Sequence, residues 1–145
     1  MWEAWRAANE KLEEEKLIAL DTLSASRVGK WHLPEELEPN AIMPYYWGSK
    51  GAGEPENGYP MYLYTHGSGP KQSEWRTGLK ICSQFDDAPS VYFIPQIPNE
   101  KNYYRWWQKA KQYAWEKLLR QSLVSGHINP DKVYFFGISE GGYGS

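Results

Sequence analysis

The chain has almost no cysteine, no long apolar run and no dominant charge, and each of these shortages excludes a class of protein. Cys82 is the single cysteine among 145 residues, so neither an internal disulfide nor a cysteine-based metal site can form. No apolar segment reaches the length of a membrane span. The formal net charge of −2 gives no electrostatic footprint for nucleic acid. We therefore expect no nucleic-acid or membrane partner, and a buried, unreactive Cys82 thiol.

The N-terminus also lacks the basic segment and apolar core of a signal peptide. A cytoplasmic protein and the mature form of an exported protein both fit this, so the compartment stays open. Aromatic residues, by contrast, are abundant, with 8 Trp and 11 Tyr. Such rings suit a core, an interface or a platform for a flat ligand such as a sugar, and composition does not choose among these.

The length suits one domain over residues 1–145. Residues 1–28 are predicted to form an N-terminal helical extension, because apolar residues recur there at helical spacing. Residues 41–47 are predicted to be an edge strand, because an edge tolerates Pro44, and 48–58 a loop. Further along the chain, the pattern predicts strands at 61–65, 90–94 and 132–136, a short helix or surface segment over 73–85, and a helix over 103–125.

Strands that alternate with helices favour parallel pairing with right-handed crossovers. The run Val133 to Phe136 is wholly apolar, which is typical of a strand covered on both faces. The predicted fold class is therefore α/β, a three-layer α/β/α sandwich with a mostly parallel sheet. Functional loops are expected at the carboxyl ends of its strands.

One short motif directly after the last predicted strand carries chemistry. Residues 137–141 read Gly-Ile-Ser-Glu-Gly and match the G-x-S-x-G nucleophile elbow. The elbow places its serine, here Ser139, on a tight strand-to-helix turn with the hydroxyl above the sheet. Gly137 and Gly141 fit because their neighbours approach too closely for a side chain. The helix after the elbow would point its N-terminus at a developing oxyanion.

A companion motif, His66-Gly67-Ser68-Gly69, follows the predicted strand at 61–65. In enzymes with this elbow, the oxyanion hole combines the backbone N–H after the nucleophile with one from an earlier strand-end loop. The pattern assigns these roles to the backbone N–H groups of Glu140 and Ser68. We expect His66 to hold its loop by hydrogen bonds rather than to act as a base. The Glu140 side chain is either exposed or paired with a nearby cation.

From about Tyr59 to Gly142 the chain resembles the α/β-hydrolase superfamily, especially its esterase and prolyl-oligopeptidase-like branches. The H-G-x-G and G-x-S-x-G-G elements match in order and spacing, including Gly142. The resemblance implies the α/β-hydrolase type of fold and a Ser-His-acid triad in which Ser139 forms an acyl-enzyme that water releases. This chemistry requires neither a metal ion nor an organic cofactor.

The sequence departs from that superfamily in one respect. The superfamily places its triad in the order Ser, acid, His, whereas His32, His66 and His127 all precede Ser139. The acid and the histidine are therefore expected downstream of Ser145, in the remaining C-terminal part of the same gene product. On this interpretation the chain is the N-terminal half of a hydrolase domain, truncated after the elbow. Alone, it is expected to show little or no turnover.

The leading functional prediction is hydrolysis of a carboxylic ester, with a small-molecule ester or a glycoconjugate as substrate. The first alternative is a prolyl-oligopeptidase-like serine peptidase, although the first 58 residues are too few for the large propeller of such enzymes. The second is a non-catalytic binding domain that keeps the fold. Tyr104 and Trp106 are candidates for a substrate pocket, with simple surface capping as the alternative, and Trp107 is expected in the core.

Overall fold

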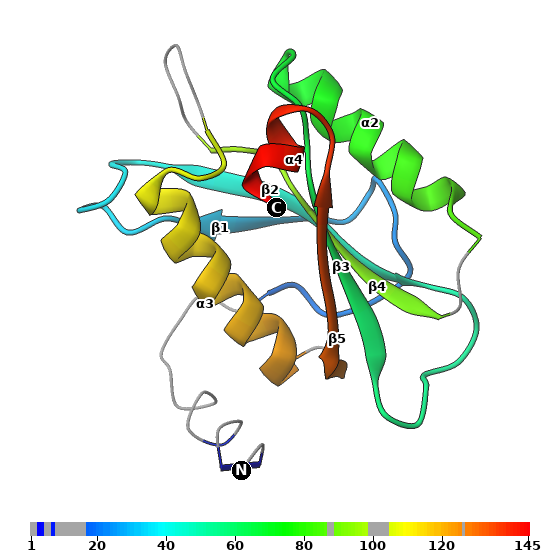
Figure 1. The fold of residues 1–145 in the computed structure, drawn as a ribbon. Helices are drawn as coiled ribbons and strands as arrows, with labels where there is room; N and C mark the ends of the chain where they lie inside the picture. The colour runs from blue at the N-terminus through cyan, green and yellow to red at the C-terminus, as the bar shows by residue number, and fades with distance from the viewer. Residues whose placement is uncertain (1–2, 5–6, 8–16, 87–88, 99–104, 126) are drawn as a thin grey trace.

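The computed structural model describes Glu3, Ala4 and Ala7 together with residues 17–86, 89–98, 105–125 and 127–145. Most of these residues build one five-stranded sheet and the helices around it (Figure 1). The strands are β1 (Val28–His32), β2 (Ile42–Lys50), β3 (Tyr59–Thr65), β4 (Ser90–Pro95) and β5 (Ile128–Gly137). The helices are α2 (Lys71–Gln84), α3 (Lys109–Ser125) and the short α4 (Glu140–Gly144).

The sheet is mixed, so the predicted mostly parallel three-layer sandwich of hydrolase type is wrong. Its strand order is β1-β2-β4-β3-β5. The pairs β1–β2 and β2–β4 are antiparallel, whereas β3–β4 and β3–β5 are parallel. The prediction rests on the three strands that alternate with helices, which are β3, β4 and β5. These strands do pair in parallel, as β3–β4 and β3–β5. The first two strands have no helix between them, and a short connection lets neighbouring strands pair antiparallel.

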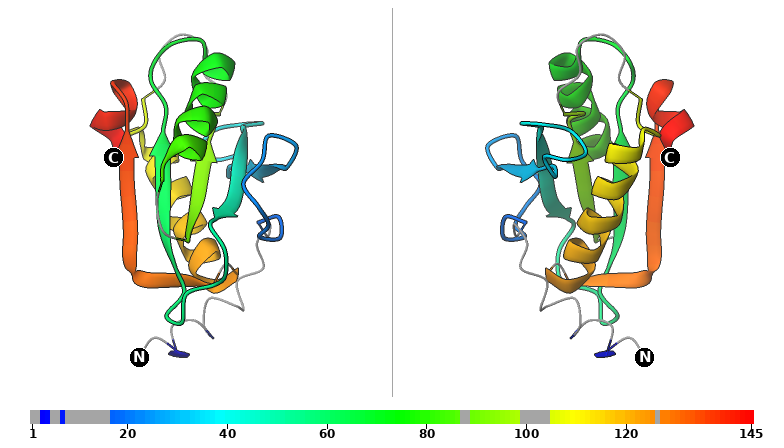
Figure 2. Two further views of the ribbon diagram at one scale, coloured as in Figure 1. Left: turned by 90° about the vertical axis from the view of Figure 1, so that its right-hand side faces the viewer. Right: turned by 90° about the vertical axis from the view of Figure 1, so that its left-hand side faces the viewer.

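The two faces of the sheet carry separate apolar clusters, because side chains alternate along a strand. Met61 and Leu63 of β3 belong to the cluster that packs under α3, and Tyr64 to the one that packs under α2. Figure 2 shows α2 in front of the sheet from one side and α3 in front of it from the other. On the α2 side, Trp75 stacks on Tyr46 with ring centroids 4.0 Å apart.

Several predicted elements are confirmed with shifted ends. The strands expected at 61–65, 90–94 and 132–136 are β3, β4 and β5, and the helices expected at 73–85 and 103–125 are α2 and α3. Of the second helix, residues 105–108 form a turn instead, and 103–104 lie outside the described residues. The strand expected at 41–47 exists as β2, but it lies inside the sheet and not at its edge.

One edge of the sheet is formed by β1, which the sequence pattern did not reveal, and the other edge is formed by β5. Residues 17–27, part of the predicted N-terminal helical extension, contain no helix, and Thr22 makes a parallel bridge with Ser49. Most of residues 1–16 lie outside the described residues. Cys82 is fully buried, as predicted. Within the described part of the chain, no helix combines the length and hydropathy needed to cross a bilayer.

A buried ion pair ties the β1–β2 connection to α3. Lys111 Nζ lies 2.6 Å from Glu38 Oε2, and the lysine side chain is only 4% exposed. Removing one partner of a buried pair leaves the other charge uncompensated, which costs far more than the intact pair contributes.

We therefore predict that Glu38→Gln lowers the free energy of unfolding by about 3 kcal/mol, because Lys111 keeps a buried charge without a counter-ion. Urea denaturation measures the change. The control is Glu116→Gln, which breaks the exposed Arg120–Glu116 pair and should cost less than about 1 kcal/mol. Equal effects of the two substitutions would contradict the prediction.

Candidate active site

The turn between β5 and α4 holds Ser139 in a conformation that side chains rarely adopt. Its backbone has φ 54° and ψ −117°, in the positive-φ region that normally suits glycine. A non-glycine residue held there costs about 1–3 kcal/mol and persists only where its surroundings enforce it. Ser139 is exposed on the surface of the chain. The sequence motif thus corresponds to a strained turn that presents a hydroxyl.

The two motif glycines allow this turn to pack against the end of β3. A methyl group at Gly141 would overlap the backbone carbonyl of Thr65, and one at Gly137 would overlap Gly141 and the Thr65 side chain. The Thr65 hydroxyl donates to Gly141 O at 2.7 Å, and Ile138 N donates to Thr65 O at 3.3 Å. The elbow is therefore bonded to the strand that leads into the 66–69 turn.

The 66–69 turn lies against the elbow, as the oxyanion-hole prediction requires. A Cβ added to Gly67 would lie 3.5 Å from Ile138 O, and one added to Gly69 would meet the Glu74 side chain. Ser68 at its tip is exposed. Within the described residues, the backbone N–H groups of Ser68 and Glu140 have no hydrogen-bond acceptor. Two N–H donors therefore stay available near the elbow.

His66 is fully buried, and both of its ring nitrogens are occupied. Ile97 N donates to His66 Nε2 at 3.1 Å, so Nε2 must be the acceptor. The proton then lies on Nδ1, which donates to Gly67 O at 2.7 Å. Burial lowers the pKa of His66 to about 4, against the opposing effect of the Gly67 hydrogen bond and with a smaller contribution from Lys71 in the same direction as burial. The neutral ring holds its loop and has no nitrogen left for a base.

The turn at 105–107, before α3, contacts both halves of the site. Trp106 Nε1 donates to His66 O at 2.8 Å, and its ring lies edge-on to the His66 ring. The Trp107 ring packs edge-on against Tyr143 of α4, with centroids 6.3 Å apart. Arg105 Nε lies 3.4 Å from Glu140 Oε1.

The burial of the aromatic residues in this turn differs from what the sequence predicts. Trp106, a candidate for the substrate pocket, is completely buried and supports the loop instead. Trp107, expected in the core, is 45% exposed. Tyr104, the other pocket candidate, lies outside the described residues.

The Glu140 side chain takes the paired alternative rather than the exposed one. Its side chain is 11% exposed and its partner is Arg105. Sequence reasoning missed Arg105, although a buried acidic residue calls for a nearby cation. It also missed Thr65, whose place at the strand end beside the motif was visible in the sequence.

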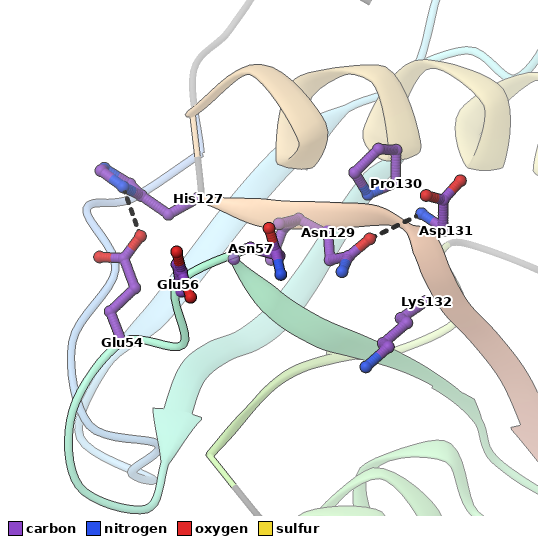
Figure 3. A pocket seen from close by; sticks show the side chains of 10 residues that line it. Glu54, Glu56, Asn57, His127, Asn129, Pro130, Asp131 and Lys132 are labelled. Carbon is purple, nitrogen blue, oxygen red and sulfur yellow. Dashed lines mark hydrogen bonds and ion pairs between the residues drawn. The ribbon is translucent and has the colours of Figure 1, made fainter.

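The other two histidines lie away from the elbow. His32 ends β1, at the opposite edge of the sheet from β5. His127 precedes β5 at the end remote from Ser139, and its Nδ1 lies 2.8 Å from Glu54 Oε1 (Figure 3). In the described part of the chain, no histidine therefore stands ready to take a proton from Ser139.

The residues drawn in Figure 3, which are 54, 56–58 and 127–132, line a polar hollow at the end of β5 remote from Ser139. Its volume is about 570 Å³. Asn129 Oδ1 within it accepts from the backbone N–H of Asp131 at 2.9 Å. Ser139 is not among its lining residues, so this hollow is separate from the elbow. No cluster of three or more His, Cys, Asp or Glu side chains in the described ranges is arranged to hold a metal ion.

Comparisons with protein-family models, with curated proteins and with solved structures find no match.

The close approach of the elbow to β3 predicts that Gly141 does not tolerate a side chain, and the neighbouring Gly142 serves as a control. Gly141→Ala should lower the free energy of unfolding by about 3 kcal/mol, because the added methyl would push the elbow off Thr65. Gly142→Ala should be neutral or slightly stabilising, since its nearest neighbour would be Gly137 O at 3.4 Å and alanine favours a helix. Chemical denaturation of both variants measures the difference. Similar stabilities would show that the elbow is not packed in this way.

The lowered pKa of His66 predicts acid sensitivity. Between pH 4 and 6.5 the unfolded chain binds a proton at this histidine that the folded chain does not, so stability falls as the pH falls through this window. From pH 7 to pH 5 this one group should remove about 2 kcal/mol. Urea unfolding at both pH values measures the loss. His66→Gln should abolish the part of the stability loss that His66 causes. His32→Gln, at an exposed position, should show the same loss as the wild type.

Proposed function

We propose that the chain carries the nucleophile and oxyanion hole of a serine hydrolase that cleaves carboxylic esters. The observation that carries the proposal is the backbone of Ser139, which has φ 54° between two glycines that permit close contact with β3. Strained non-glycine residues cluster at functional sites, where the surrounding structure enforces them. The motif resemblance to the α/β-hydrolase superfamily points to the same chemistry.

In the proposed reaction, Ser139 Oγ attacks the carbonyl carbon of the ester while a histidine accepts its proton. The carbonyl oxygen becomes an oxyanion, which the N–H groups of Ser68 and Glu140 stabilise. Collapse of this intermediate breaks the bond to the alcohol, which leaves with the proton from the histidine. Water then attacks the acyl-enzyme with the same base, and the acid product leaves Ser139 free again.

The histidine and its orienting acid are proposed to come from the gene product downstream of residue 145. His66 supports this assignment, because its ring nitrogens are already engaged by Ile97 and Gly67. His32 and His127 lie at remote positions in the sheet. The described residues thus offer no histidine as a base, and residues 1–145 alone should turn over a short activated ester little faster than a Ser139→Ala variant.

The proposed substrate is a small-molecule ester or a glycoconjugate. Trp107 and Tyr143 support an apolar or ring-bearing group, because they are 45% and 80% exposed and pack against each other beside the elbow. Each exposed ring offers an apolar face on which such a group can pack. The proposed chemistry needs neither a metal ion nor a cofactor.

A fluorophosphonate probe on the full-length gene product tests the proposal. We predict that it labels Ser139, that Ser139→Ala abolishes labelling, and that Ser68→Ala keeps it, since Ser68 acts through its backbone. Peptide mapping of the labelled protein identifies the site. No labelling of the wild type would support the non-catalytic binding domain instead. Turnover of a peptide amide at a rate comparable to that of the matching ester would support the peptidase.

A further inference from the structure

The three consecutive residues Arg105, Trp106 and Trp107 each contact a different part of the proposed site. Trp106 reaches the turn at His66, and Trp107 reaches Tyr143 of α4. Arg105 reaches the elbow itself, with its Nε 3.4 Å from Glu140 Oε1. One short segment therefore links both strand ends from which the proposed oxyanion donors come.

The contact between Arg105 and Glu140 is an ion pair rather than a good hydrogen bond. Glu140 Oε1 is buried and, within the described residues, has no hydrogen-bond partner, although the guanidinium lies within ion-pair distance. A buried carboxylate oxygen without a hydrogen bond is costly. Replacing a buried ion pair by apolar residues of similar size is often neutral or stabilising, so the pair is weak evidence for a role in stability.

The backbone at Ser139 gives the pair a mechanical role. The ψ of Ser139, −117°, sets the direction of the next peptide unit, which carries the Glu140 N–H. A residue at positive φ relaxes to an ordinary conformation unless its neighbours are fixed. Thr65 fixes Gly141 on one side, and Arg105 is placed to fix Glu140 through its side chain.

We propose that Arg105 is a positioning residue that aims the Glu140 N–H at the oxyanion by holding the Glu140 carboxylate. The inference rests on the proposed function. It predicts that loss of the pair weakens stabilisation of the tetrahedral intermediate while binding of the ester stays nearly unchanged. The effect therefore falls on kcat and on the phosphonylation rate of Ser139, and much less on KM.

The experiment compares Glu140→Gln, Arg105→Gln, Arg105→Lys and the double Gln variant in the full-length gene product. Each preparation is normalised by titrating its active serine, so that only folded, reactive sites count. The Glu140→Gln change keeps the backbone N–H and the side-chain shape while removing the charge. We expect about a 10-fold loss of kcat in each single Gln variant, less than the ~100-fold that follows loss of an entire oxyanion donor. KM should change less than about two-fold.

Two further measurements separate positioning from a general loss of structure. The double variant should be no slower than the worse single variant, because the Arg105–Glu140 pair is the contact that both changes break, and Arg105→Lys should recover part of kcat. Arg120→Gln, which breaks an exposed pair on α3, is the matched control and should leave kcat unchanged. If wild-type Ser139 is unreactive, the proposed function and this inference both fail. A reactive wild type with an unchanged kcat in Glu140→Gln overturns the inference alone.

Discussion

The close approach between the ends of β3 and β5 is the constraint on which the site depends. Thr65 lies so near Gly141 and Gly137 that neither glycine position has room for a side chain, and its hydroxyl bonds to Gly141 O. This contact holds the chain after β5 in a bend. Without the contact, the Ser139 backbone would relax to an ordinary conformation. The parallel pairing of β3 with β5 brings the two motifs to the same edge of the sheet.

Around that contact, buried polar groups hold loops rather than react. Both ring nitrogens of His66 hydrogen-bond to backbone groups, and Trp106 adds a third hydrogen bond to the same turn. Buried polar groups that are fully hydrogen-bonded make a loop rigid. The strained serine thus stands between a fixed strand end and a fixed turn, the arrangement that preorganised amides require.

The local features of the site could be predicted from the sequence, and the wider sheet could not. The elbow and the 66–69 turn follow from glycines and apolar strands that are neighbours in the chain. The strand β1, with only Trp31 and Gly29 buried, alternates too briefly to be recognised, and its pairing with β2 depends on distant partners. The positions of Trp106 and Trp107 also depend on distant partners. Trp107 was expected in the core but is exposed, whereas Trp106 was expected near the surface but is buried. Adjacent tryptophans point in different directions, and the turn that decides between them carries no periodic pattern.

The contact between Thr65 and Gly141 joins residues 76 positions apart. Closing the intervening chain costs entropy before such a contact can form, and non-local contacts of this kind slow folding. The strained serine therefore has nothing to enforce it until helix α3 has docked and β5 has paired. Nascent chains would hold this segment relaxed, with its hydroxyl no more reactive than any other. On the proposed function, Ser139 would become reactive only after this contact has formed, so chains still being synthesised would be protected from acylation.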